Sequence, residues 1–307
     1  MRNGFAQNIT ELAIHDSRII LLSGDIGNRL FDEFKTNRPN QFYNCGVAEA
    51  NMMGVASGMA LSGLRPFVYT ITPFTTARCF EQVKIDVCYH NVPVVIIGTG
   101  SGLSYAALGP THHSLEDIAI FRTLPNMRIV APCDIVELKH ALHAVIKDNV
   151  PTYIRIGKKG EPLIHKNPFK FEFGKAVILR PGQRVALLST GTIMSEVIKT
   201  AEQLEARGIS TEVVSFHTVK PLDTEYLKSA ANKFELIAVI EEHGKIGGLG
   251  SAINDWRIEQ GFSCKQINFG TGDEFMHEIG NQQYARARYG LTADNIVNQI
   301  TNQLIHI

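Results

Sequence analysis

The chain has 307 residues, of which 44% are hydrophobic and 20% are charged, and this is ordinary for a soluble globular protein with two hydrophobic cores. Its 30 basic and 30 acidic residues give a formal net charge of zero. This balance argues against nucleic acid or an anionic membrane as a partner, because both attract proteins with a basic excess. A surface with little net charge is compatible with a protein partner.

The N-terminal residues 1–16 lack the apolar segment of a signal peptide and have the pattern of an amphipathic helix. No stretch approaches the roughly 18 apolar residues that span a bilayer. The cysteines are scattered without a Cys-x-x-Cys spacing, at Cys45, Cys79, Cys88, Cys133 and Cys264. Scattered thiols suit a reducing compartment, so we expect structural cysteines in a cytoplasmic protein.

Short apolar, β-branched segments alternate with helical patterns, which predicts parallel strand–helix–strand units. The first half has predicted strands at residues 18–22, 67–70, 92–99, 127–131 and 152–156, and predicted helices at 48–62, 76–90, 114–122 and 135–147. Capping-box spacings, Ser114 with Asp117 and Asp134 with Glu137, mark the starts of two of these helices. The fold class predicted here is α/β, with doubly wound domains.

Residues 157–182 interrupt the alternation with many Lys, Pro and Gly, and contain at most a hairpin over 171–179. The alternation then resumes with predicted strands at 185–189, 210–215 and 236–241 and predicted helices at 194–206, 224–233, 249–260 and 295–304. We therefore predict a first domain over residues 1–160, a linker over 161–182 and a second domain over 183–307.

The first candidate for chemistry is Glu49, which follows a short predicted strand over 41–45 and opens a helix rich in Gly, Ala and Ser. Such a helix packs closely against a neighbour, so we expect the carboxylate to be desolvated. A desolvated carboxylate can exchange a proton with a heterocyclic nitrogen. The competing interpretation is an acid at a helix N-terminus that interacts with the helix dipole.

Two further candidates follow other predicted strands. Phe74 lies at a turn after the strand over 67–70, where an aromatic ring can stack on a flat ligand or simply fill the core. Arg78 begins the next helix and faces either solvent or an anionic ligand. His112 and His113 lie in a Gly-rich loop before a helix, where neutral imidazoles can donate to a substrate oxygen. A third metal ligand at a useful spacing is missing there, so we predict no metal site.

The glycine-rich segments are weak signals. Residues 23–28 follow a strand and contain Asp25, but they match neither a dinucleotide fingerprint nor a Walker sequence. Residues 244–250 have too irregular a spacing for the fingerprint. We interpret both as turns between a strand and a helix.

The order of these motifs along the chain is more informative than each motif alone. Asp25, then GVAEANMMGVASGMALSG, TPFTTARCFEQV, GPTHHSLEDIAIFR and PNMRIVAPCD, resemble the pyrimidine-binding domain of transketolases. The segment Ile240-Glu241-Glu242-His243 with its following glycines looks like the transketolase C-terminal domain. The resemblance covers essentially the whole chain, and it implies a thiamine-diphosphate-dependent enzyme that moves a two-carbon ketol unit from a ketose to an aldose.

The resemblance also implies roles for single residues. Glu49 matches the glutamate that hydrogen-bonds the cofactor's aminopyrimidine N1′ and so promotes loss of the thiazolium C2 proton. Phe74 matches the aromatic residue that stacks on that ring. His112, with His113 beside it, matches the histidine that contacts substrate oxygens. Cofactor or substrate contacts are likewise implied by similarity or proximity for Asp25, Arg78 and Arg155, the last as a phosphate ligand.

Some positions depart from the transketolase pattern. His113 replaces the usual glutamine, Thr99-Gly100-Ser101 stands where a Thr-His-Asp run is expected, and Arg29 aligns near a phosphate-binding serine. These departures favour a modified or nucleotide-linked sugar, such as one destined for a surface polysaccharide, over a plain pentose or hexose phosphate.

The diphosphate-binding motif of these enzymes, Gly-Asp-Gly followed by Asn, is absent from the sequence, where only Gly24-Asp25-Ile26 comes close. That motif binds Mg²⁺ through oxygen ligands. The resemblance therefore implies an N-terminal transketolase subunit as partner, which would supply the Mg²⁺ ligands and share thiamine diphosphate across the interface. Closed two-fold symmetry suggests an α2β2 assembly, with the helix after Glu49 in the interface.

Three alternatives remain open at this point. The beta subunit of a 2-oxo-acid dehydrogenase decarboxylase component has the same domain order, but Thr111-His112 and the helix containing Arg78 favour a transketolase. Half of a 1-deoxyxylulose-5-phosphate synthase is less favoured, because those enzymes are usually single chains. A non-catalytic scaffold subunit would have no need of Glu49, Phe74 and His112.

Overall fold

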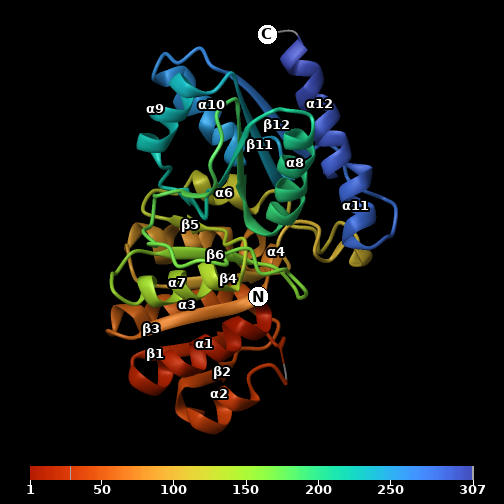
Figure 1. Ribbon diagram of the computed structural model, residues 1–307. Coiled ribbons are helices and arrows are strands. Elements are labelled where there is room, and N and C mark those ends of the chain that lie inside the picture. The colour runs from red at the N-terminus through yellow and green to blue at the C-terminus, as the bar shows by residue number, and fades with distance from the viewer. Residues whose placement is uncertain (28, 306–307) are drawn as a thin grey trace.

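A computed structural model describes residues 1–27 and 29–305, and it contains two α/β units in contact with each other (Figure 1). The first unit lies in the lower part of Figure 1 and the second, with the C-terminal helices, in the upper part. Within the described residues, no helix is long and apolar enough to cross a membrane. The α/β fold class predicted from the alternating pattern is confirmed.

The first unit is built on a seven-stranded sheet with the order β10-β5-β6-β4-β3-β1-β2. Its strands are β1 (Ile19–Ser23), β2 (Phe42–Asn44), β3 (Arg65–Ile71), β4 (Val95–Thr99), β5 (Arg128–Val130), β6 (Thr152–Ile156) and β10 (Thr218–Lys220). All pairs are parallel except β10 with β5. The central strands are buried on both faces, which explains their continuous apolar runs.

Helices cover both faces of this sheet, as a doubly wound fold requires. Alternate residues of β1 point to opposite faces, so Ile19 and Leu21 pack with one group of helices and Ile20 and Leu22 with the other. The first group contains α1 (Arg2–His15), α2 (Asp32–Asn37) and α7 (Ile135–Val145); the second contains α3 (Glu49–Leu61), the π-helical segment η3 (Val83–Tyr89) and α6 (Asp117–Arg122).

The second unit has a five-stranded sheet with the order β12-β11-β8-β9-β7. Its strands are β7 (Val177–Arg180), β8 (Val185–Thr190), β9 (Thr211–Ser215), β11 (Leu236–Gly244) and β12 (Lys265–Thr271). Its helices are α8 (Met194–Ala206), α9 (Thr224–Lys233), α10 (Leu249–Glu259), α11 (Gln282–Arg288) and α12 (Ala293–Ile305). Of these, β12 and α11 have no counterpart in the sequence prediction.

Two local predictions are wrong. No hairpin forms over residues 171–179; instead β7, placed in the linker from sequence, is an antiparallel edge strand beside β9. Ser114 does not cap a helix, since α6 begins only at Asp117 without a side-chain cap. In contrast, Asp134 does cap α7 by accepting the backbone N–H groups of Val136 and Glu137.

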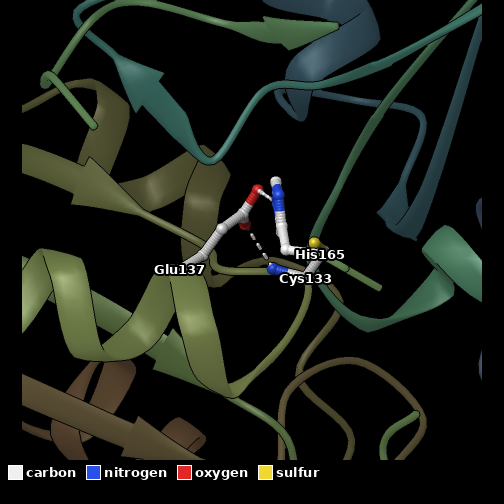
Figure 2. A group of neighbouring side chains, drawn as sticks. All are labelled: Cys133, Glu137 and His165. Carbon is white, nitrogen blue, oxygen red and sulfur yellow. Dashed lines mark hydrogen bonds and ion pairs between the residues drawn. The ribbon is translucent and has the colours of Figure 1, made fainter. Parts of the chain in front are cut away.

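The two units are joined by buried polar contacts as well as by apolar ones. Figure 2 shows one junction, where Glu137 of α7 accepts a hydrogen bond from Nε2 of His165 at 2.8 Å and from the backbone N–H of Cys133 at 2.7 Å. Ser215 of β9 donates to the same carboxylate at 2.6 Å. The carboxylate, Cys133 and His165 are the type of group that binds metals, but here three donors already occupy Glu137. We interpret the group as a hydrogen-bonded junction of the linker and both units.

Candidate functional site

The candidate residues gather at one edge of the first sheet. In a parallel sheet, the carboxyl ends of the strands meet at one edge, which is where α/β proteins bind ligands. Asp25 follows β1, Glu49 follows β2, Phe74 follows β3 and the loop with His112 follows β4. Four strand ends thus bring together residues that lie far apart in the sequence.

Glu49 is the first residue of α3 and its side chain is only 2% exposed. Nη1 of Arg78 donates a hydrogen bond to its Oε2 at 3.0 Å, and the Arg78 side chain is 45% exposed. The carboxylate is therefore buried at its base and reached by a cation that lies on the solvent side. A carboxylate so placed can hold or release a proton toward a ligand that replaces the cation.

Phe74 lies in a short helical turn, α4 (Thr72–Thr75), directly after β3. Its ring is half-buried, with the guanidinium carbon of Arg78 4.0 Å from the ring centre. Burial is the main cause that raises the pKa of the Cys79 thiol to about 12, and the nearby Glu49 adds to it. The thiol therefore stays protonated and donates a hydrogen bond to the carbonyl of Thr75 at 3.1 Å. This hydrogen bond helps to fix the turn that presents Phe74.

His112 contacts the Phe74 ring. Its ring meets Phe74 edge-to-face with centroids 5.4 Å apart, and it lies 6.2 Å from the ring centre of Tyr105. Nδ1 is hydrogen-bonded to the Thr111 hydroxyl at 2.9 Å. Burial is the main cause that lowers the pKa of His112 below its usual value of 6.5, and the nearby His113 adds to this effect. A neutral imidazole at neutral pH is the form that the sequence led us to expect.

Glu49, Phe74, Arg78 and His112 thus form a continuous series of contacts, which we call the Glu49 site. It combines a buried carboxylate, a half-exposed aromatic face and a neutral imidazole. These three groups can bind a flat nitrogen heterocycle, exchange a proton with it and donate a hydrogen bond to an adjoining oxygen.

Asp25 and Arg29 lie at the periphery. Asp25 is exposed, has a positive φ of 57° and accepts a hydrogen bond from Asn44 at 2.8 Å. Arg29 is exposed and lines a surface hollow of about 390 Å³ together with Arg2 and Glu33. Neither contacts the Glu49 site, so their roles as cofactor and substrate ligands stay predictions.

His113 is turned away from His112. Its side chain is 4% exposed, and its Nε2 lies 3.3 Å from the carbonyl oxygen of Ala106. It lines a cavity of about 580 Å³ between the two units instead. A direct contact of His113 with substrate stays a prediction.

Arg155 is buried at the contact between the two units, and its role as a phosphate ligand stays a prediction. It is 2% exposed, and its Nε pairs with Oδ2 of Asp117 at 2.7 Å. Its Nη2 donates to the carbonyl oxygens of Ser114 at 2.7 Å and Glu242 at 2.9 Å. The guanidinium therefore joins the two units and does not project into the Glu49 site. Sequence similarity did not reveal the contact with the Glu242 carbonyl, because that atom belongs to the second unit.

Two residues near His112 were missed from the sequence. The ring centre of Tyr105 lies 6.2 Å from that of His112, and Nζ of Lys158 is 4.6 Å from the centre of the Tyr105 ring. Lys158 follows the carboxyl end of β6, so its place at the ligand-binding edge was a usable signal. It supplies a half-exposed cation beside the Tyr105 ring.

Comparisons with known proteins agree with this geometry. Residues 1–161 match the family model described as the transketolase pyrimidine binding domain, and residues 174–296 match the transketolase C-terminal domain. A protein of Phocaeicola vulgatus, named as one of the subunits of an apulose-4-phosphate transketolase, is 34% identical over 96% of this chain and 94% of its own length. A 6-deoxy-6-sulfo-D-fructose transketolase subunit of a Clostridium species is also 34% identical, over 97% of this chain and 92% of its own length.

Solved structures give the same result. One described as "Split gene transketolase, inactive beta4 tetramer" superposes with a TM-score of 0.89 at 30% identity, covering 98% of this chain and 96% of that one. The transketolase of Campylobacter jejuni has a TM-score of 0.83 at 19% identity and is covered over 46% of its length, which shows a common fold. The chain therefore belongs to the transketolase family and consists of its pyrimidine-binding domain followed by its C-terminal domain.

Proposed function

We propose that this chain is the pyrimidine-binding subunit of a two-subunit transketolase, which transfers a two-carbon ketol unit from a ketose donor to an aldose acceptor. The observation that carries the proposal is the Glu49 site, in which a buried carboxylate and an aromatic face contact the same flat, N–H-bearing group. In this structure that group is the guanidinium of Arg78.

The contacts that Arg78 makes indicate whether the site fits the aminopyrimidine ring of thiamine diphosphate. A guanidinium is planar, donates N–H bonds and stacks on aromatic rings. The aminopyrimidine of the cofactor needs the same two contacts, a stacking face and a carboxylate beside a ring nitrogen. Phe74 and Glu49 would hold it, with Glu49 keeping a proton at the ring nitrogen N1′. The cofactor, when bound, supplies the carbon that carries the ketol unit.

His112 has the complementary task at the substrate. It lies at the rim of the same site, 5.4 Å from the Phe74 ring centre, with a neutral imidazole. A neutral imidazole can donate a hydrogen bond to a substrate oxygen and later accept a proton, whereas an imidazolium could only donate. We propose that His112 orients the donor ketose and stabilises negative charge on its oxygens.

A partner subunit would complete the site. The sequence lacks the Gly-Asp-Gly…Asn pattern for Mg²⁺ and diphosphate, so both would be bound by a subunit that carries the diphosphate-binding domain. The helix α3 and the adjacent η3 expose large apolar side chains at Val55, Leu61, Ile85 and Tyr89. We propose this face as the subunit interface of an α2β2 assembly.

The substrate class follows from cations around the site and from the relatives. Lys158 beside Tyr105 and the exposed Arg29 offer positive charge for a ketose with an anionic group far from the reacting carbons. The relatives described above are named for a sugar phosphate, apulose 4-phosphate, and for a sulfonated sugar. We therefore propose a modified, negatively charged ketose, with a nucleotide-linked sugar as one form that it could take.

The test is reconstitution with a diphosphate-binding subunit, thiamine diphosphate and Mg²⁺. Donors to compare are xylulose 5-phosphate, sulfonated and branched ketoses and nucleotide-linked sugars, with glycolaldehyde transfer to an aldose followed by mass spectrometry. Transfer of a two-carbon unit from any ketose supports the proposal. If pyruvate is the only donor that turns over, the proposal is overturned. Turnover with a lipoyl acceptor would favour a 2-oxo-acid decarboxylase, and turnover with glyceraldehyde 3-phosphate would favour a deoxyxylulose-phosphate synthase. Unchanged turnover after Glu49→Gln in the reconstituted complex would leave a scaffold role.

A further inference from the structure

We propose that Glu242 of the second unit is a positioning residue for the loop of residues 100–116, which carries His112 and which we call the His112 loop. This loop connects β4 to α6 in the first unit, whereas Glu242 belongs to β11 in the second. The proposal gives the C-terminal domain a part in organising the active site. Its catalytic consequence rests on the proposed function, but the placement of the loop does not.

Glu242 is 2% exposed, and its carboxylate accepts hydrogen bonds at the interface between the units. Its Oε1 accepts the backbone N–H of Leu103 at 2.6 Å and Nε2 of Gln282 at 2.8 Å. Its Oε2 accepts Nε of Arg286 at 2.5 Å. A buried carboxylate with three donors, one of them a cation, makes a strong and directional anchor.

The backbone of the His112 loop fits closely against this carboxylate. Gly102 has a φ of +60°, and a Cβ atom there would lie 2.6 Å from Oε1 of Glu242. The carbonyl of Gly102 accepts the N–H of Ser114 at 2.9 Å, which ties the two ends of the loop together. The anchor at Leu103 is therefore transmitted to the residues that directly follow His112 and His113.

Apolar contacts support the same arrangement. Leu103 and Ala106 of the loop are buried in a small cluster with Met276 and Ala285 of the second unit. In Figure 1, α11 lies beside the yellow segment of the loop, which includes the short helix η4 (Ala106–Leu108). The loop is thus packed against α11 while Glu242 holds its start.

A second anchor holds the end of the loop. The N–H of Gly244 in β11 donates to the carbonyl of Leu115 at 2.8 Å, and Arg155 bridges the carbonyls of Ser114 and Glu242. Between the two anchors, Leu108, Pro110 and Thr111 are exposed, and His112 is half-buried against Phe74. A displacement of about 1 Å in a catalytic group can cost about 100-fold in rate, so the rigidity of the anchors matters for His112.

The test is Glu242→Gln, which keeps the size of the side chain but makes one acceptor oxygen an NH₂ donor. Arg286 would retain the remaining oxygen, so the new NH₂ would face the N–H of Leu103. The matched control is Glu212→Gln, because Glu212 is equally buried but its partners, Tyr226 and Lys233, lie in its own unit. Amide hydrogen exchange in the full chain reports the loop without any need for activity.

We expect exchange of residues 103–115 to accelerate about tenfold or more in Glu242→Gln, as expected from loss of one hydrogen bond to a charged group, and to stay unchanged in Glu212→Gln. Unchanged loop exchange in Glu242→Gln, or equal acceleration in Glu212→Gln, would overturn the proposal. If Glu242→Gln does not fold, Gln282→Ala removes a single donor from the cluster. A smaller acceleration confined to the loop is then expected, and none would overturn the proposal.

In the reconstituted complex, we expect Glu242→Gln to lower kcat/KM for the ketose donor about 10- to 100-fold. Exchange of the C2 proton of bound thiamine diphosphate, which depends on Glu49, should stay at the rate of the unmodified complex. Equal loss of both activities would contradict a role confined to the His112 loop. If the unmodified complex transfers no ketol unit, the proposed function fails, while the hydrogen-exchange result on the loop still stands.

Discussion

Nη1 of Arg78 donates a 3.0 Å hydrogen bond to Oε2 of Glu49, so a half-exposed cation neutralises a carboxylate that is 2% exposed. The same guanidinium covers the Phe74 ring. A pyrimidine bound at this site would take over both contacts, and Arg78 would have to move aside, where it is available for an anionic substrate. Under the proposed function, Arg78 would link the state of the cofactor site to the substrate side.

Replacing Arg78 should first reduce stability. Arg78→Ala leaves the buried Glu49 carboxylate without its cation, which we expect to lower the free energy of unfolding of the isolated chain by about 1–3 kcal/mol. Urea unfolding measures this change. Arg18→Ala is the control, because its pair with Asp16 is exposed and should contribute less than about 1 kcal/mol. Equal effects of the two substitutions would contradict a special role for the Arg78–Glu49 pair.

The pH dependence should follow His112. Its pKa lies below 6.5 because of burial and the neighbouring His113, so the neutral form persists down to that pH. Donor kcat/KM should therefore be constant from neutral pH to about 6.5 and fall below it as the imidazole becomes protonated. In His113→Gln the repulsion from His113 is absent, so the acidic limb should move to higher pH. His15→Gln, at an exposed site far from the loop in sequence, should leave the profile unchanged. A limb that does not move in His113→Gln would contradict this assignment.

The buried pair at the interface of the units should be important for stability. Burial opposes ionisation of Asp117, but Arg155 and His243 outweigh it, so the pKa of Asp117 lies below its usual value. Asp117→Asn would leave the Arg155 guanidinium uncompensated, which we expect to cost about 3–5 kcal/mol. Chemical denaturation provides the measurement, with Glu235→Gln in the exposed Arg184–Glu235 pair as control, expected within about 1 kcal/mol. A loss below about 1 kcal/mol for Asp117→Asn would show that the pair is dispensable.

The exposed glycine on α3 offers a test of the proposed subunit interface. A Cβ atom at Gly58 would meet no atom within 4 Å in this chain, so Gly58→Leu should fold normally. If α3 packs against the partner, the added side chain should weaken assembly about tenfold or more, corresponding to about 1.4 kcal/mol. Analytical ultracentrifugation of the mixed subunits measures this. Glu202→Leu, which adds the same side chain to an exposed position of α8, should assemble normally; weakening by both variants or by neither would contradict the interface.

The sequence predicted the elements that depend on local pattern. The strand over 152–156 and the helices beginning at Ile135, Met194 and Thr224 agree with the structure, because apolar periodicity and caps such as Asp134 act over a few residues. The helix predicted over 76–90 is interrupted, with a π-helical part at Val83–Tyr89, since helical periodicity does not distinguish these forms. The strands β7, β10 and β12 were missed because all three are edge strands defined by pairing with other segments.

The same distinction applies to the site. Glu49, Phe74 and His112 follow strand ends of one parallel sheet, so their convergence was predictable once the strands were placed. The location of Arg155 was not, because the carbonyl of Glu242, one of its partners, is brought to it only by the contact between the two units. The pairing of Arg78 with Glu49 was also not predicted, because it depends on how the segment after β3 turns toward α3.

The most direct test of the central claim is the exchange of the thiamine diphosphate C2 proton in the reconstituted complex, followed by NMR after acid quenching. In Glu49→Gln, we expect this exchange to slow at least about 100-fold, because the group that exchanges a proton with the pyrimidine is removed. The complex should still assemble and still bind the cofactor. Exchange and ketol transfer at the unmodified rate in Glu49→Gln would contradict the account.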